Sequence, residues 1–194
     1  NTNRKIVIVD DGLAMPDPEE TQQIRHRNYR SPEELTVDLA GNLPPCANAE
    51  LQRLMQRAFV QVVMDASKTE RQINRLMNSA VYLLCWIRRY HSQLFHGYEG
   101  ADIPCFILMG GCQNVHDARY LRFLSLLPVD ILILAPDLNR VCTLNDPRLL
   151  ELTGADSLPV MKFPRDSSSA QMRTVAAHAE SELTSLLYQD SGLY

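Results

Sequence analysis

The chain has 194 residues, a formal net charge of −4, and hydrophobic and charged fractions of 45% and 22%, which are ordinary values for a globular protein. The acidic balance gives no basis for binding nucleic acid or anionic lipid, and no apolar run approaches the ~20 residues that a membrane helix requires. Five cysteines without a CxxC pair favour a reducing, cytoplasmic location.

The first predicted element is a buried strand over residues 5–9, a β-branched run that ends at Asp10, Asp11 and Gly12. Residues 13–47 are polar and rich in proline, as is typical of a long functional or flexible connection. Within them, the spacing predicts one short helix over 31–41. Its capping box runs from Ser31 to Glu34 and its end is at Gly41.

A helical region of about 47–97 follows and reads as an insertion into the domain. Two apolar stripes at helical spacing predict two helices, with the break near the polar residues 65–68. Four arginines of this region, at positions 71, 75, 88 and 89, are interpreted as a solvated helix face.

Residues 102–137 carry the pattern that organises the chain. Two short apolar runs, 103–109 and 129–135, flank a helical pattern that starts near Val115. Two buried strands joined by a helix cannot form a hairpin, so they are expected to pair in parallel through a right-handed crossover.

The closing part predicts a short helix over 148–153, a strand over 158–163 and an amphipathic helix over 168–188. We therefore expect a three-layer, Rossmann-like α/β domain with helices on both faces of a mainly parallel sheet. Its strands would be four, near 5–9, 104–109, 130–135 and 159–163. Because the chain begins with Asn1 and stops just after a helical pattern, residues 1–194 are interpreted as a single domain excised from a longer protein.

Three carboxylates stand at predicted carboxyl ends of strands: Asp10, Asp11 and Asp137. In parallel sheets those ends lie at one edge, where ligands bind. The carboxylates could therefore bind a ribose hydroxyl or a divalent metal, or take part in proton transfer. Aspartate also caps turns wherever a strand ends, and the two interpretations carry similar weight.

Gly110, Gly111 and Asn114 lie where the second strand gives way to a helix. Such a turn can direct backbone amides at a phosphate or carboxylate, with Arg140 as the nearest basic residue along the sequence. The match to a phosphate-binding motif is weak, because the residues fit neither GxGxxG nor GxxxxGK[ST]. The favoured interpretation is that a tight turn needs glycine for positive φ in any case and that Asn114 simply caps the helix.

No residue can be assigned a catalytic role from the sequence, and the sequence leaves the cofactor and the metal, if the protein uses either, unknown. Cys112 beside the helix start could be nucleophilic with His116 as its base, but a lone cysteine in a turn is usually inert. The five histidines do not have the spacing of metal ligands. Whether the protein is an enzyme stays open.

Residues 103–194 resemble the bacterial YceG-like family, found among tellurium-resistance and general stress gene clusters. The resemblance rests on a glycine-terminated strand, a Leu/Phe-rich helix and a series of short motifs: Pro136-Asp137, Asp146-Pro147, Phe163-Pro164, Thr174-x-Ala176, Ala179-Glu180 and the terminal Leu187-Tyr188-x-Asp190 to Tyr194. The resemblance implies that the protein is a component of a biosynthetic or stress-response module. It does not identify any catalytic residue in this chain.

Two classes of function follow. One is a domain that binds a phosphorylated small molecule, such as a nucleotide or sugar nucleotide, at residues 10, 11, 110, 111, 114, 137 and 140. The other is a non-catalytic module whose helices over 48–95 dock a partner or the remainder of the full-length protein.

Overall fold

The structure is a computed structural model and describes residues 4–10, 12–135 and 149–150. All of them belong to a compact unit, Asn1–Lys162. Within the described residues, no helix is long and apolar enough to cross a membrane.

The sheet contains β1 (Ile6–Val9), β2 (Cys105–Met109) and β3 (Asp130–Leu134), in that spatial order. Both pairings are parallel, with Ile6 opposite Cys105 and Cys105 opposite Asp130. The structure therefore confirms the first three predicted strands to within one residue at each end, together with their parallel pairing. The fourth predicted strand, 159–163, lies outside the described residues.

Five helices are described: α1 (Pro18–Gln22), α2 (Pro32–Ala40), α3 (Ala49–Ser67), α4 (Ile73–Phe95) and α5 (Val115–Ser125). The predicted break near 65–68 is confirmed, since α3 ends at Ser67. The sequence analysis did not predict α1, which begins after the N-cap Asp17.

Capping residues explain where the predicted helices begin. Ser31 Oγ accepts a hydrogen bond from the Glu34 amide, as predicted, and fixes the start of α2. The carboxylate of Glu34 accepts from the Arg30 amide instead of from Ser31, so the capping box is only half formed. At α3, Asn48 Oδ1 accepts from the amides of Glu50 and Leu51, each at 3.0 Å.

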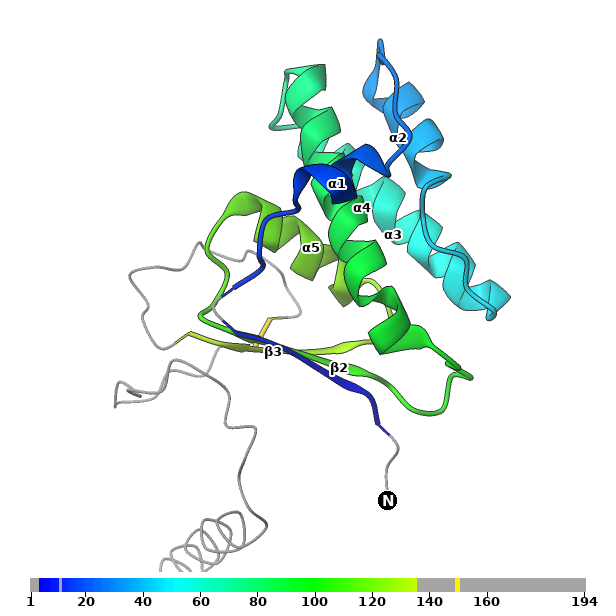
Figure 1. Cartoon of the computed structure of the whole chain (residues 1–194), viewed down its shortest axis with the longest axis vertical. Helices are drawn as coiled ribbons and strands as arrows, with labels where there is room; N and C mark the ends of the chain where they lie inside the picture. Colours follow the sequence, from blue (N-terminus) through cyan, green and yellow to red (C-terminus); the bar gives the residue numbers. More distant parts are fainter. Residues whose placement is uncertain (1–3, 11, 136–148, 151–194) are drawn as a thin grey trace, which may run out of the picture. The chain divides into compact units, whose positions relative to one another are not determined.

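The described helices lie on one face of the sheet, with α4 and α5 directly against it (Figure 1). The order of the strands in the sheet, β1-β2-β3, is the same as their order in the sequence. Because both connections run in the same direction across the sheet, right-handed crossovers place all the connecting helices on the same face. The expected layer of helices on the other face is not seen among the described residues, so the three-layer arrangement stays a prediction.

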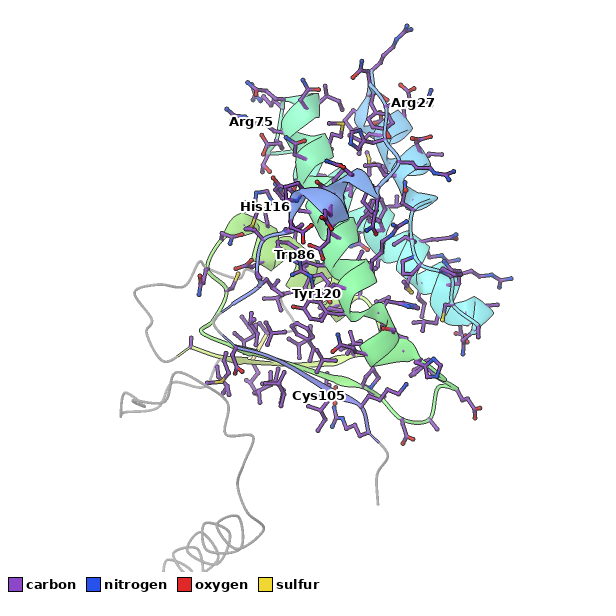
Figure 2. The ribbon with its side chains drawn as sticks, in the orientation of Figure 1. Arg27, Arg75, Trp86, Cys105, His116 and Tyr120 are labelled. Atoms are coloured by element: carbon purple, nitrogen blue, oxygen red, sulfur yellow. The ribbon has the colours of Figure 1, made fainter. Side chains whose placement is uncertain are left out.

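Side chains from both layers meet in one hydrophobic core, and the largest of them come from α3, α4, α5 and β2. Trp86 and Tyr120 lie between the helices and the sheet, where Tyr120 also contacts Phe106 (Figure 2). The apolar stripes of α3 and α4 are buried in this core. The outward face of the sheet, in contrast, leaves Ile6 and Leu132 57% and 44% exposed.

Candidate functional site

The loops after β1 and β2 lie side by side at the carboxyl edge of the sheet. The Gly12 amide donates to the Met109 carbonyl at 3.1 Å, and the Gly110 amide donates to the Leu134 carbonyl at 2.9 Å. These two bonds join the ends of all three strands. The half-buried Asp10 follows β1 directly, so it lies at the same edge as Gly110 and Gly111.

Three glycines at this edge have positive φ: 81° at Gly12, 91° at Gly110 and 76° at Gly111. Side chains rarely adopt this conformation, so the turn requires glycine whether or not a ligand binds. An added Cβ at Gly12 would lie 3.0 Å from Nε2 of Gln113, the end of an exposed, flexible side chain that can move aside. The positive φ is therefore the stronger reason for glycine at position 12.

Asn114 caps α5, as the simpler interpretation predicted. Its Oδ1 accepts from the amides of His116 and Asp117 at 2.8 and 3.1 Å. Those two amides at the helix start are thus occupied by the protein itself. An anion at this edge would have to approach the backbone ahead of the cap, where Gly110 is half-buried and Gly111 is buried.

Asp117 was missed by the sequence analysis and is the most buried carboxylate of the region, at 1% exposure. Its Oδ2 accepts from the Gln113 amide at 3.0 Å, while Oδ1 is buried without a hydrogen-bond partner among the described residues. Burial raises the pKa of this carboxyl group. The spacing Asn114-x-x-Asp117 resembles a capping box and could have indicated it.

Cys112 is not positioned as a nucleophile. Its side chain is 1% exposed, and Sγ donates to the Asn114 carbonyl at 3.5 Å. His116 instead places Nδ1 3.2 Å from Ser79 Oγ on α4. The structure thus favours the inert interpretation of this cysteine.

Three of the predicted site residues, Asp11, Asp137 and Arg140, lie outside the described residues. The other four, Asp10, Gly110, Gly111 and Asn114, are at the carboxyl edge as the parallel pairing requires. In the described part of the chain, no group of three or more His, Cys, Asp or Glu side chains is arranged to hold a metal ion.

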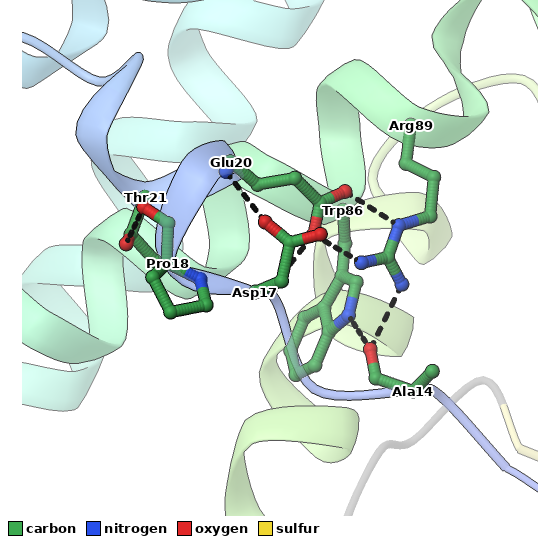
Figure 3. A network of polar contacts seen from close by, with 7 residues as sticks. All are labelled: Ala14, Asp17, Pro18, Glu20, Thr21, Trp86 and Arg89. Carbon is green, nitrogen blue, oxygen red and sulfur yellow. Dashed lines mark hydrogen bonds and ion pairs between the residues drawn. The ribbon is translucent and has the colours of Figure 1, made fainter.

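A polar network from α4 holds the loop after β1 in place (Figure 3). The Ala14 carbonyl accepts from Trp86 Nε1 at 2.9 Å and from Arg89 Nη1 at 2.8 Å. Arg89 also forms a two-pronged ion pair with Glu20 of α1, with Nε 2.9 Å from Oε1. The network anchors the chain between β1 and α1, and with it the position of the carboxyl edge.

The solvated-face interpretation is therefore wrong for one of the four arginines, the half-buried Arg89, which binds Glu20 and Ala14. Arg88 is exposed as predicted, and its Nε also donates to the Asn42 carbonyl at 3.0 Å. Their partners lie 46 or more positions away in the chain, so local sequence could not reveal them. Arg71 and Arg75 are exposed, as predicted.

Arg89→Leu is expected to lower the free energy of unfolding by about 1–3 kcal/mol, because Glu20 and Ala14 lose charge-assisted hydrogen bonds. Urea denaturation measures this, with the exposed Arg75→Leu as a control that should change stability by less than ~0.5 kcal/mol. Hydrogen bonding from Arg89 lowers the pKa of Glu20. The pair's contribution is therefore present above the unfolded pKa of Glu20 and is lost as the pH falls through the lower folded pKa. A difference between wild type and variant that does not shrink in acid would contradict this.

Comparison with known proteins gives one match. The family model of the YceG domain matches residues 1–188. Neither the search of curated proteins nor the search of solved structures found a match.

Proposed function

The chain belongs to the YceG domain family, and on that premise we propose that it binds a phosphorylated small molecule, such as a nucleotide or sugar nucleotide, at the carboxyl edge of its sheet. The observation that carries the proposal is the parallel pairing of β1, β2 and β3. The carboxyl ends of parallel strands lie together at one edge of the sheet, and α/β proteins bind ligands at that edge.

Each described residue of the edge has a distinct part in the proposal. A phosphate group would meet the positive-φ backbone of the turn first at the half-buried Gly110, because the adjoining Gly111 is buried. The Asp10 carboxylate would repel a bare phosphate, so it is assigned to a sugar hydroxyl or to a divalent cation that accompanies the phosphates. The proposed site also includes Asp11, Asp137 and Arg140, which are assigned to it from the sequence alone.

The biological setting is a further part of the proposal. We place the protein in a biosynthetic or stress-response module of bacteria, near tellurium-resistance functions, on the strength of the sequence resemblance. Four cysteines among the described residues, at positions 46, 85, 105 and 112, are free thiols. Free thiols support a reducing, cytoplasmic location.

A screen of nucleotides, sugar nucleotides and divalent metals by thermal shift tests the proposal. A ligand at a hundred times its Kd should stabilise the protein by ~2.7 kcal/mol. Asp10→Asn is expected to weaken binding of a hit by about tenfold or more, because a charge-assisted hydrogen bond to a hydroxyl or a charged metal ligand is lost. Asp130→Asn is the matched control, because Asp130 is the first residue of β3 and so lies at the amino ends of the strands. Equal losses in both variants would contradict the assignment.

A second candidate function is a non-catalytic module that binds the remainder of a larger stress-response protein. The observation that favours it is the outward sheet face, where Ile6 and Leu132 are exposed. The helices over 48–95 are less suited to docking through their apolar stripes, because those stripes are already buried in the core. No stabilisation by any compound in the screen would favour this second function.

A further inference from the structure

Several backbone amides at the carboxyl edge are already bonded within the protein. The Gly110 amide donates to the Leu134 carbonyl at 2.9 Å. The Gln113 amide donates to Asp117 Oδ2 at 3.0 Å, and the adjoining Gly111 is buried. Gly110 therefore allows a phosphate to come close to the turn without offering its amide. A phosphate bound at this edge is expected to depend on donors from side chains as well.

Three side chains of the loops 12–16 and 110–114 carry a hydrogen-bond donor. The Cys112 thiol is buried and donates to the Asn114 carbonyl at 3.5 Å. The Asn114 side chain caps α5, where its Oδ1 accepts from two amides. Gln113, in contrast, is an exposed residue, so the two N–H donors on its Nε2 are accessible from solvent. Of these three side chains, Gln113 is the one best able to donate to a ligand.

Contacts of its backbone and of its side chain place the Gln113 carboxamide at the carboxyl edge. Its backbone amide is held by Asp117, a side chain that is itself 1% exposed. Its carboxamide lies against the loop after β1, since a Cβ added at Gly12 would be 3.0 Å from Nε2 and 3.5 Å from Oε1. The backbone of Gln113 is thereby fixed between the two loops, whereas the exposed end of the side chain can turn toward a ligand.

We propose that the Gln113 carboxamide is a phosphate-binding group of the carboxyl edge, donating from Nε2 to phosphate oxygens of the ligand. The assignment rests on the function proposed above and adds a residue that the sequence pattern did not indicate. The loops 12–16 and 110–114 contain no lysine or arginine. A neutral donor binds a phosphate less strongly than a cation does. The site therefore favours a phosphate ester or diphosphate, whose other groups add contacts, over inorganic phosphate.

Isothermal titration calorimetry of the full chain with ADP and with UDP-glucose tests the assignment. Gln113→Ala should weaken the binding of a diphosphate by about tenfold or more, the factor that loss of a hydrogen bond to a charged group brings. Gln113→Glu removes the same donors and adds a negative charge that repels the phosphates, so it should weaken binding further.

Two controls separate this effect from changes in fold or overall charge. Gln56→Glu makes the same charge change at an exposed position of α3 and should leave the dissociation constants unchanged. Because the Gln113 side chain is exposed, Gln113→Ala and Gln113→Glu should melt within about 2 °C of the wild type. Adenosine lacks the phosphates, so its binding should be the same in the wild type and in Gln113→Ala.

The possible outcomes distinguish the role of Gln113 from the function of the edge. If the diphosphates bind equally well to the wild type and to Gln113→Ala, the role of Gln113 is overturned and the function proposed for the edge stands. An equal loss of affinity for adenosine would assign the carboxamide to the nucleoside and would also overturn it. If neither ADP nor UDP-glucose binds to the wild type, the proposed function is contradicted, and the role of Gln113 with it.

Discussion

Trp86→Ala is expected to lower the free energy of unfolding by about 3–5 kcal/mol, a large part of the ~5–15 kcal/mol that stabilises a typical domain. Trp86 is fully buried on α4, contacts Tyr120 and donates its indole N–H to the Ala14 carbonyl. The variant loses both the ring's packing and one of the two donors that hold the loop after β1. Urea denaturation followed by circular dichroism measures the change.

Trp86→Phe separates the two contributions. It keeps an aromatic ring in the core and removes the indole N–H, so we expect a loss of about 1–2 kcal/mol. Val37→Ala, at an exposed position of α2, is the control and should change stability by less than ~0.5 kcal/mol. A Trp86→Ala variant as stable as the control would show that the core is not organised around α4.

Phe106→Ala is expected to cost about 3–5 kcal/mol as well, because Phe106 is fully buried on the inner face of β2 between Tyr90 and Tyr120. Leu132→Ala, on the outer face of β3, should cost about 1 kcal/mol, since this side chain is 44% exposed. Equal costs at the two positions would contradict the difference in burial between Phe106 and Leu132. They would indicate that the outer face is covered at Leu132 as it is at the neighbouring Ile107, which is 6% exposed.

The strands and the long helices could be predicted from local patterns. The apolar runs at β2 and β3 and the stripes of α3 and α4 fix both the type and the approximate ends of these elements. The helix α1 was missed because it has five residues in a polar, proline-rich stretch. Its signal was the capping box from Asp17 to Glu20, which the structure shows fully formed.

The candidate site could be predicted only where it depends on strand order along the chain. Asp10, Gly110 and Gly111 follow their strands directly, so parallel pairing alone brings them to one edge. The contacts of Arg89 depend on how α4 packs against α1, which no local pattern encodes. The sequence resemblance rests on residues 103–194. The family model matches residues 1–188 and so also covers the first part of the chain, where the resemblance gave no support.

The central claim is that a ligand binds at the carboxyl edge of the sheet. The most direct test is an NMR titration of the protein with a compound that stabilised it in the nucleotide and sugar-nucleotide screen, in which the chemical shift of each backbone amide is followed. We predict that the perturbed amides cluster at residues 10–12 and 110–114, the two loops joined by the bond between Gly12 and Met109. Perturbations confined to the outer sheet face around Ile6 and Leu132 would contradict the claim.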